Sequence, residues 1–127
     1  MVQPYLIILP TENKGRGVFA SADIPAGTII EISPVIVMEQ KDRGQLDQTK
    51  LHDYIFEWGG DLLQCCVGLG YISIYNHSYM ANCEYEMDFE NELMTIKTVS
   101  DVNLGDELFI NYNGTFNDPK PVWFEVQ

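Results

Sequence analysis

The chain has 127 residues, 46% of them hydrophobic, with 7 Tyr, 6 Phe and 2 Trp, so we expect one globular domain rather than a disordered chain. Its net charge of −12, from 19 acidic and 7 basic side chains, argues against direct nucleic-acid binding, because that affinity comes mainly from Lys and Arg. A basic protein or peptide is a better-matched partner, and solubility alone is the alternative explanation of the charge.

Cysteine usage and hydrophobic runs predict the compartment. Cys65, Cys66 and Cys83 form an odd set without a C-x-x-C framework, which suits a reducing environment. Residues 1–10 lack the basic and long apolar regions of a signal peptide, and no apolar run approaches the ~20 residues that span a bilayer. We expect an intracellular, cytoplasmic protein (or one of the host nucleus if the chain is viral), with no membrane partner and with a homodimer possible.

The first part of the chain predicts short strands. Residues 5–9 are apolar and β-rich and end at Pro10, and residues 14–20 enter a second strand through Gly15 and Gly17. Glycines at this spacing permit positive φ and close approach of a ligand; the alternative is that they only make a turn. Because no helix follows, the pattern is not a dinucleotide or P-loop fingerprint.

The middle of the chain predicts a long strand and an insertion. Residues 28–39 are strand-like, and Pro34 within them indicates an edge or a bend. Residues 40–58 form the insertion, for which we predict a short helix near residues 45–52 followed by a strand. Residues 62–75 are almost wholly apolar and are expected to be buried.

A hairpin with an acidic outer face follows. Hydrophobic and acidic residues alternate from position 83 to 90, and residues 93–99 return after a turn. The predicted inner face carries Cys83, Tyr85, Met87 and Phe89, and the predicted outer face carries Glu84, Glu86, Asp88 and Glu90. With a further strand at residues 108–112, the predicted fold is mostly β.

Two polar blocks interrupt this pattern. Asn76-His77-Ser78 with Asn82 is flanked by apolar residues, and residues 105–112 form a second block after the hairpin. Buried polar groups need hydrogen-bond partners, so the first block is expected to organise a site. The alternative is that His77 is a satisfied core histidine and Tyr112 a core tyrosine.

Three blocks in order, residues 14–20, residues 75–83 and residues 105–112, resemble the SET domain of protein-lysine methyltransferases. The resemblance extends from about Tyr5 to Trp123 and is strongest to the minimal viral and bacterial members. It implies a single domain over residues 1–127 with a β-clip of short curved sheets, a small helical insertion and a C-terminal pseudoknot. In that pseudoknot, the C-terminal segment passes beneath a loop and lies against the Asn76-His77 block, and residues 113–127 form the C-terminal tail.

The same resemblance implies transfer of a methyl group from S-adenosylmethionine to the ε-amine of lysine in a basic protein or histone-like tail. The implied catalytic residues are Tyr112 and Tyr54. The implied cofactor-binding residues are Lys14, Gly15, Arg16, Gly17, Asn76, His77, Tyr112 and Trp123. The implied walls of the substrate channel are Tyr54, Tyr75, Tyr112, Trp123 and Phe124.

The chemistry requires a neutral amine, whereas free lysine has a pKa of about 10.4. A sulfonium charge and desolvation in an aromatic channel both favour the neutral form, and positioning then supplies most of the acceleration. Many SET enzymes place a cysteine such as Cys83 in a zinc site, but its C-terminal partners are missing here, so we predict no metal. The alternatives are a non-catalytic SET module that binds a peptide, or another β-clip ligand-binding module.

Overall fold

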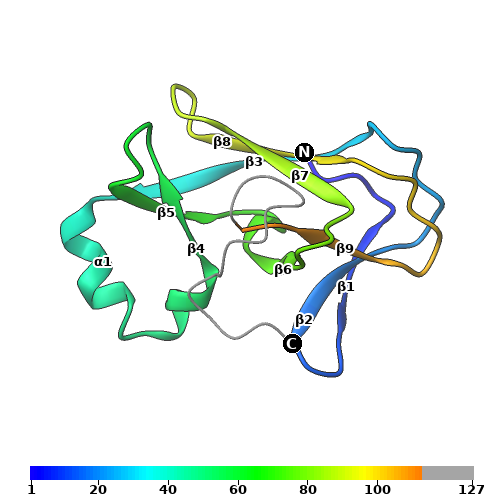
Figure 1. Cartoon of the computed structure of the whole chain (residues 1–127), viewed down its shortest axis with the longest axis horizontal. Helices are drawn as coiled ribbons and strands as arrows, with labels where there is room; N and C mark the ends of the chain where they lie inside the picture. The colour runs from blue at the N-terminus through cyan, green and yellow to red at the C-terminus, as the bar shows by residue number, and fades with distance from the viewer. Residues whose placement is uncertain (113–127) are drawn as a thin grey trace.

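The structure is a computed structural model that describes residues 1–112 and is built mainly from strands (Figure 1). The strands are β1 (Leu6–Pro10), β2 (Arg16–Ala20), β3 (Ile29–Met38), β4 (Ile55–Trp58), β5 (Gln64–Gly68), β6 (Asn76–His77), β7 (Cys83–Asp88), β8 (Leu93–Thr98) and β9 (Glu107–Ile110). The helical elements are α1 (Gln40–Leu46) and the 3-10 turns η1 (Lys50–Tyr54) and η2 (Ile72–Ile74). The mostly β prediction is confirmed, whereas the tail with Trp123 and Phe124 lies outside the described residues.

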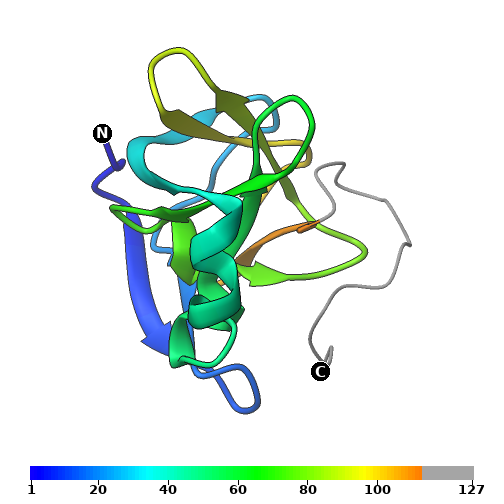
Figure 2. The same cartoon turned by 90° about the vertical axis from the view of Figure 1, so that its left-hand side faces the viewer.

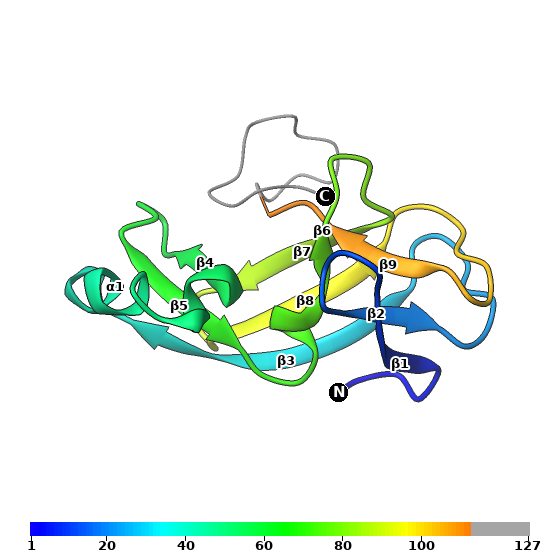
Figure 3. The same ribbon diagram turned by 90° about the horizontal axis from the view of Figure 1, so that it is seen from below.

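The strands form two sheets. One has the order β1-β2-β9-β6 and the other has the order β4-β5-β3-β8-β7. In Figure 3, β3 and β8 run along the molecule, and β2 and β9 lie side by side at one end of it. Among residues 1–112, the strand pairs are antiparallel except for β6 with β9. Strand β6 has two residues and joins the first sheet through β9, which lies about thirty positions later in the chain.

Pro34 marks the point at which β3 changes partners. Residues 29–34 of β3 pair with β8, up to Pro34 opposite Leu93, and residues 35–38 pair with β5, beginning with Val35 opposite Gly68. A proline has no N–H to donate, so it fits best where one ladder ends and the other begins. The predicted division at Pro34 is therefore a change of neighbour within one continuous strand.

The insertion contains a helix, but at an earlier position than predicted. Helix α1 occupies Gln40–Leu46 at one end of the molecule, and the predicted range of 45–52 covers instead its last residues and most of a 3-10 turn (Figures 1 and 2). The main-chain N–H of Glu39 donates to the Asp42 carboxylate at 3.2 Å, which favours a start near residue 40. The strand predicted to follow is β4.

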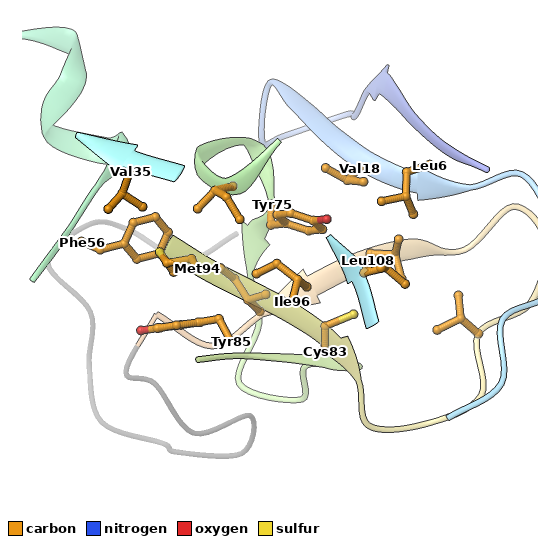
Figure 4. Close-up of a cluster of buried hydrophobic side chains, with 14 of the residues drawn as sticks. Leu6, Val18, Val35, Phe56, Tyr75, Cys83, Tyr85, Met94, Ile96 and Leu108 are labelled. Carbon is orange, nitrogen blue, oxygen red and sulfur yellow. The ribbon is translucent and has the colours of Figure 1, made fainter. Parts of the chain in front are cut away.

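The core confirms the hairpin and corrects the apolar run. Cys83 and Tyr85 of β7 are buried beside Met94 and Ile96 of β8 (Figure 4). Glu86 is exposed as predicted, whereas Phe89, which was predicted for the inner face, lies in the turn after β7 and is 46% exposed. The prediction that residues 62–75 are buried throughout is wrong. Three leucines of that run are 41–52% exposed, because they lie in the turns on either side of β5. These are Leu62, Leu63 and Leu69.

The described part of the chain also limits what else the fold contains. Cys65, Cys66 and Cys83 are buried free thiols. Within residues 1–112, no group of three or more His, Cys, Asp or Glu side chains is arranged to hold a metal ion. No helix in the same residues has the length and apolar composition needed to cross a membrane.

Candidate active site

The two polar blocks of the sequence lie side by side. Strand β6 runs parallel to β9, with Asn76 opposite Phe109 and His77 opposite Ile110 (Figure 3). The ladder continues where the Ser78 N–H donates to the Ile110 carbonyl at 3.0 Å. Residues about thirty positions apart therefore share one short sheet, as the resemblance implied.

Asn82 fastens this arrangement and was missing from the predicted site residues. Its side-chain amide donates to the Glu107 carbonyl at 2.9 Å, and its Oδ1 accepts from the Phe109 N–H at 2.8 Å. The amide thus bonds a carbonyl and an N–H of the β9 backbone in the way that a neighbouring strand would. The available signal was its position inside the polar block, since an asparagine that is partly removed from water must satisfy both ends of its amide.

Gly17 allows Asn76 to approach the backbone of β2. The Asn76 amide Nδ2 donates to the Arg16 carbonyl at 3.1 Å and to Glu107 Oε2 at 2.8 Å. A Cβ on Gly17 would lie 2.5 Å from Glu107 Oε2 and 2.9 Å from Asn76 Nδ2. Because both N–H directions of the amide are used inside the protein, Asn76 Oδ1 is the atom that the amide offers as an acceptor to a ligand.

The other residues of the glycine loop lie at the edge of this cluster. Gly15 has φ of +68° with open space around its Cα, so its role is to turn the chain, and the Arg16 side chain is exposed. Lys14 Nζ donates to the His77 carbonyl at 3.3 Å and lies 4.8 Å from the centre of the Phe109 ring. The Lys14 side chain therefore flanks the Asn76 cluster, and Arg16 contributes its main-chain carbonyl to it.

His77 is buried and accepts a main-chain hydrogen bond. Its Nδ1 receives the Tyr112 N–H at 3.1 Å, and the Tyr79 ring packs edge-on with a centroid distance of 4.5 Å. Burial, and next the charge of Lys14, lowers the pKa of His77. An accepting Nδ1 requires the neutral ring with its proton on Nε2, which agrees with that direction.

Tyr112 is held through its backbone and through its hydroxyl. The hydroxyl donates to the Tyr75 carbonyl at 2.6 Å, the Tyr112 carbonyl accepts from the Tyr85 hydroxyl at 3.0 Å, and the Phe56 ring lies 5.2 Å away. Burial, followed by nearby Tyr54 and other acidic groups, raises the pKa of the Tyr112 phenol. Tyr112 therefore remains a neutral phenol in a fixed aromatic setting.

The structure distinguishes the other two predicted channel tyrosines within residues 1–112. Tyr54 is half-buried, and its carbonyl accepts from Ser73 Oγ at 2.8 Å. The Tyr75 side chain is fully buried in the core (Figure 4). Its hydroxyl donates to Glu31 Oε1 at 2.8 Å. The ring of Tyr75 thus packs inside the core, while its carbonyl accepts from the Tyr112 hydroxyl, and its place in a channel wall stays a prediction.

Comparisons with known proteins agree with this geometry. The family profile described as SET domain matches residues 15–113. The chain is 35% identical over 126 residues to a protein of Schizosaccharomyces pombe named histone-lysine N-methyltransferase, H3 lysine-37 specific; the match covers 98% of this chain and 80% of that protein.

Two solved structures share the fold. A Plasmodium falciparum protein, described as a candidate histone methyltransferase, superposes with a TM-score of 0.67 at 26% identity, over 91% of this chain and 98% of that one. A chain of apo ctPRC2 in an autoinhibited state gives a TM-score of 0.75 at 18% identity, over 91% of this chain and 16% of that chain. The second likeness extends to the fold alone.

Proposed function

Because the chain belongs to the SET-domain family and is a protein-lysine N-methyltransferase, we propose that it transfers methyl groups from S-adenosylmethionine to lysine in a basic, histone-like tail. The observation that carries this proposal is the fixation of Tyr112. Its N–H is bonded to His77 and its hydroxyl to the Tyr75 carbonyl, beside the ring of Phe56. Such rigid placement is what a positioning mechanism requires.

The residues around Gly17 fit the chemistry of this cofactor. Its carboxylate suits the cations of Lys14 and Arg16, and its ammonium group suits an acceptor such as Asn76 Oδ1. The missing side chain of Gly17 is what allows the Asn76 amide to lie against the chain. When bound, the cofactor would supply an electrophilic methyl group.

The protein would act on the lysine by excluding water and by orienting the amine. The rings of Phe56 and Tyr85 pack near Tyr112 and provide an apolar setting that disfavours an ammonium. Tyr112 stays protonated and donates its hydroxyl hydrogen to the Tyr75 carbonyl. The lone pairs of its oxygen can then accept a hydrogen bond from an N–H of the incoming amine. No general base is needed, because the lysine ammonium loses a proton to water, and the neutral amine that results accepts the methyl group.

The charge of the chain supports a basic substrate. Strand β7 is an edge strand of its sheet and carries Glu84, Glu86 and Asp88 on alternate positions. Together with a net charge of −12, this face would attract a Lys/Arg-rich tail. The S. pombe relative is named for a lysine of H3, which makes H3 tail peptides the first substrates to test.

The alternative is a SET module that binds a partner without catalysis. Calorimetry with S-adenosylmethionine, followed by radiolabelled methyl transfer to H3 peptides and whole histones, separates the two functions. Cofactor binding with transfer supports the enzyme, and binding without transfer supports the module. Absence of cofactor binding would contradict the proposal. Activity is also expected to rise from about pH 7 to 9 as free lysine deprotonates.

A further inference from the structure

Glu31 is a buried carboxylate outside the residues assigned above. It lies in β3 and is 0% exposed among apolar neighbours. Three groups donate to it: Ser33 Oγ at 2.6 Å, the Tyr71 N–H at 2.8 Å and the Tyr75 hydroxyl at 2.8 Å. A buried carboxylate is costly unless it is fully hydrogen-bonded, and an apolar residue would fill the same space at lower cost.

Two of the three donors of Glu31, the Tyr71 N–H and the Tyr75 hydroxyl, come from the segment that leads into the site, and the third, Ser33, lies in β3 itself. Gly70, with φ of +58°, permits this approach, because a Cβ there would lie 2.5 Å from both Glu31 Oε2 and Ser33 Oγ. The carboxylate therefore fixes the segment of residues 71–75 at both of its ends, through Tyr71 and Tyr75.

The same segment contacts both candidate catalytic tyrosines. Ser73 Oγ accepts from the Gly68 N–H at 2.9 Å and donates to the Tyr54 carbonyl at 2.8 Å. The Tyr75 carbonyl accepts the Tyr112 hydroxyl at 2.6 Å. A displacement of this segment would therefore be felt by Tyr54 and by Tyr112 together, without any contact between Glu31 and substrate.

We propose that Glu31 is a positioning residue for methyl transfer: by holding the Tyr75 hydroxyl and the Tyr71 N–H, it sets the Tyr75 carbonyl that orients the Tyr112 hydroxyl. This inference rests on the proposed function for its kinetic consequence. The geometric part, coupling of Glu31 and Tyr75 to Tyr112, stands without it. Since reacting groups must lie within narrow limits, a small shift of Tyr112 lowers turnover more than binding.

The kinetic test compares Tyr75→Phe with Thr98→Val. Both changes remove a buried hydroxyl, but Thr98 lies in β8, and its hydroxyl bonds to Pro25 and Thr28 in the segment just before β3. We expect Tyr75→Phe to lower kcat at least about fivefold with both KM values within about twofold, and Thr98→Val to leave kcat within about twofold. Glu31→Gln, which keeps an acceptor for Tyr75, should retain more turnover than Glu31→Leu.

A double-mutant cycle tests whether the effect passes through Tyr112. In a Tyr112→Phe background the hydroxyl that meets the Tyr75 carbonyl is gone, so adding Tyr75→Phe should change the residual rate less than about twofold. An equal loss of kcat in both backgrounds, or an unchanged kcat in Tyr75→Phe alone, would overturn the proposal. So would a loss of turnover in Thr98→Val equal to that in Tyr75→Phe.

A readout without turnover separates this proposal from the proposed function. In protein labelled with ¹³Cζ-tyrosine, the Tyr112 resonance should move in Tyr75→Phe and Glu31→Gln and stay in place in Thr98→Val. A Tyr112 resonance that stays in place in Tyr75→Phe overturns the positioning role, whatever turnover shows. A wild-type protein that transfers no methyl, with the resonance still moving, overturns only the methyltransferase function.

Discussion

The Tyr112 hydroxyl donates to the Tyr75 carbonyl at 2.6 Å, across 37 positions of sequence. This bond joins the end of β9 to the residue immediately before β6, so the two strands that carry the polar blocks are tied by a side chain as well as by their ladder. It also commits the one hydrogen of the phenol to the protein. Under the proposed function, the oxygen would then be left to accept from an incoming amine.

Tyr112→Phe should separate catalysis from binding. The ring and its packing against Phe56 are kept, while the hydroxyl that orients the amine is lost. We expect cofactor affinity to stay within severalfold and turnover to fall at least about tenfold, which corresponds to about 1.4 kcal/mol of barrier. Calorimetry and initial rates provide the two measurements. Tyr5→Phe, outside the site, is the control, and unchanged turnover in Tyr112→Phe would show that the tyrosine is misassigned.

Gly17→Ala should lower cofactor affinity more than stability. The new methyl group would overlap Glu107 Oε2 and Asn76 Nδ2, which are ends of side chains that can move aside. The fold can accommodate that movement, but the amide of Asn76 then leaves its place. We expect at least a tenfold loss of affinity, about 1.4 kcal/mol, by calorimetry.

Gly44→Ala is the matched control for Gly17→Ala. Gly44 lies in α1 with no atom near its added Cβ, so an alanine there should stabilise the helix by about 0.5–1 kcal/mol without changing affinity. Equal affinities of the Gly17 and Gly44 variants for S-adenosylmethionine would mean that the Asn76 cluster is not the cofactor site.

Asn82→Ala should destabilise the protein more than an ordinary substitution of a surface asparagine. It removes two hydrogen bonds to the β9 backbone and leaves the Phe109 N–H and the Glu107 carbonyl without them. We expect a loss of about 2 to 3 kcal/mol in urea unfolding. Asn91→Ala in the exposed hairpin turn should cost about 0.5 kcal/mol or less. Similar losses of stability in the two variants would contradict the role of Asn82 in holding the β9 backbone.

The lowered pKa of His77 predicts how stability depends on pH. The unfolded chain binds a proton at this residue below its ordinary pKa near 6.5, whereas the folded chain resists it, so the unfolded state holds more protons between the two pKa values. Stability contributed by neutral His77 is therefore complete above pH of about 6.5 and is lost as pH falls through that value toward the folded pKa.

Melting temperatures between about pH 7.5 and 5 measure this effect. Lys14, Tyr79 and Tyr112 lie against His77, and over this window the unfolded chain takes up the proton that the folded ring resists. The slope should shrink in His77→Asn and persist in His52→Gln, because His52 lies in the exposed insertion beside Asp47. A slope that is the same in His77→Asn as in the wild type would contradict the prediction.

Local patterns predicted the β hairpin and the strands well, because alternation records which face of a sheet is buried. The exposed Leu62 and Leu63 show the limit of that reasoning, since an apolar composition does not say which side chains lie in a turn. The start of α1 was also missed, because its signal is the Glu39–Asp42 contact rather than an apolar period. The type of an element could be predicted where its hydrophobic residues were periodic, but the residues at which elements begin and end could not.

The residue types of the candidate site could be predicted from the sequence, whereas the hydrogen bonds among them could not. Asn76, His77 and Tyr112 followed from a polar block in apolar surroundings and from the resemblance, but nothing local shows that His77 accepts from the Tyr112 N–H. The place of Tyr75 in the core depends on Glu31, which is 44 positions away. Such pairs are set by tertiary packing, so sequence patterns alone cannot show which tyrosine faces a substrate and which faces the interior.

The place of β9 between β2 and β6 has a consequence for biosynthesis. When the ribosome has released the chain up to His77, the sheet neighbour of that strand is still unmade, because Ile110 follows 33 residues later. Pairings so distant in sequence form late in folding. The Asn76 cluster therefore cannot be completed until residue 110 has been made, and the cofactor would recognise the finished protein rather than a nascent fragment. Loading with S-adenosylmethionine would then report completed folding in a cell extract.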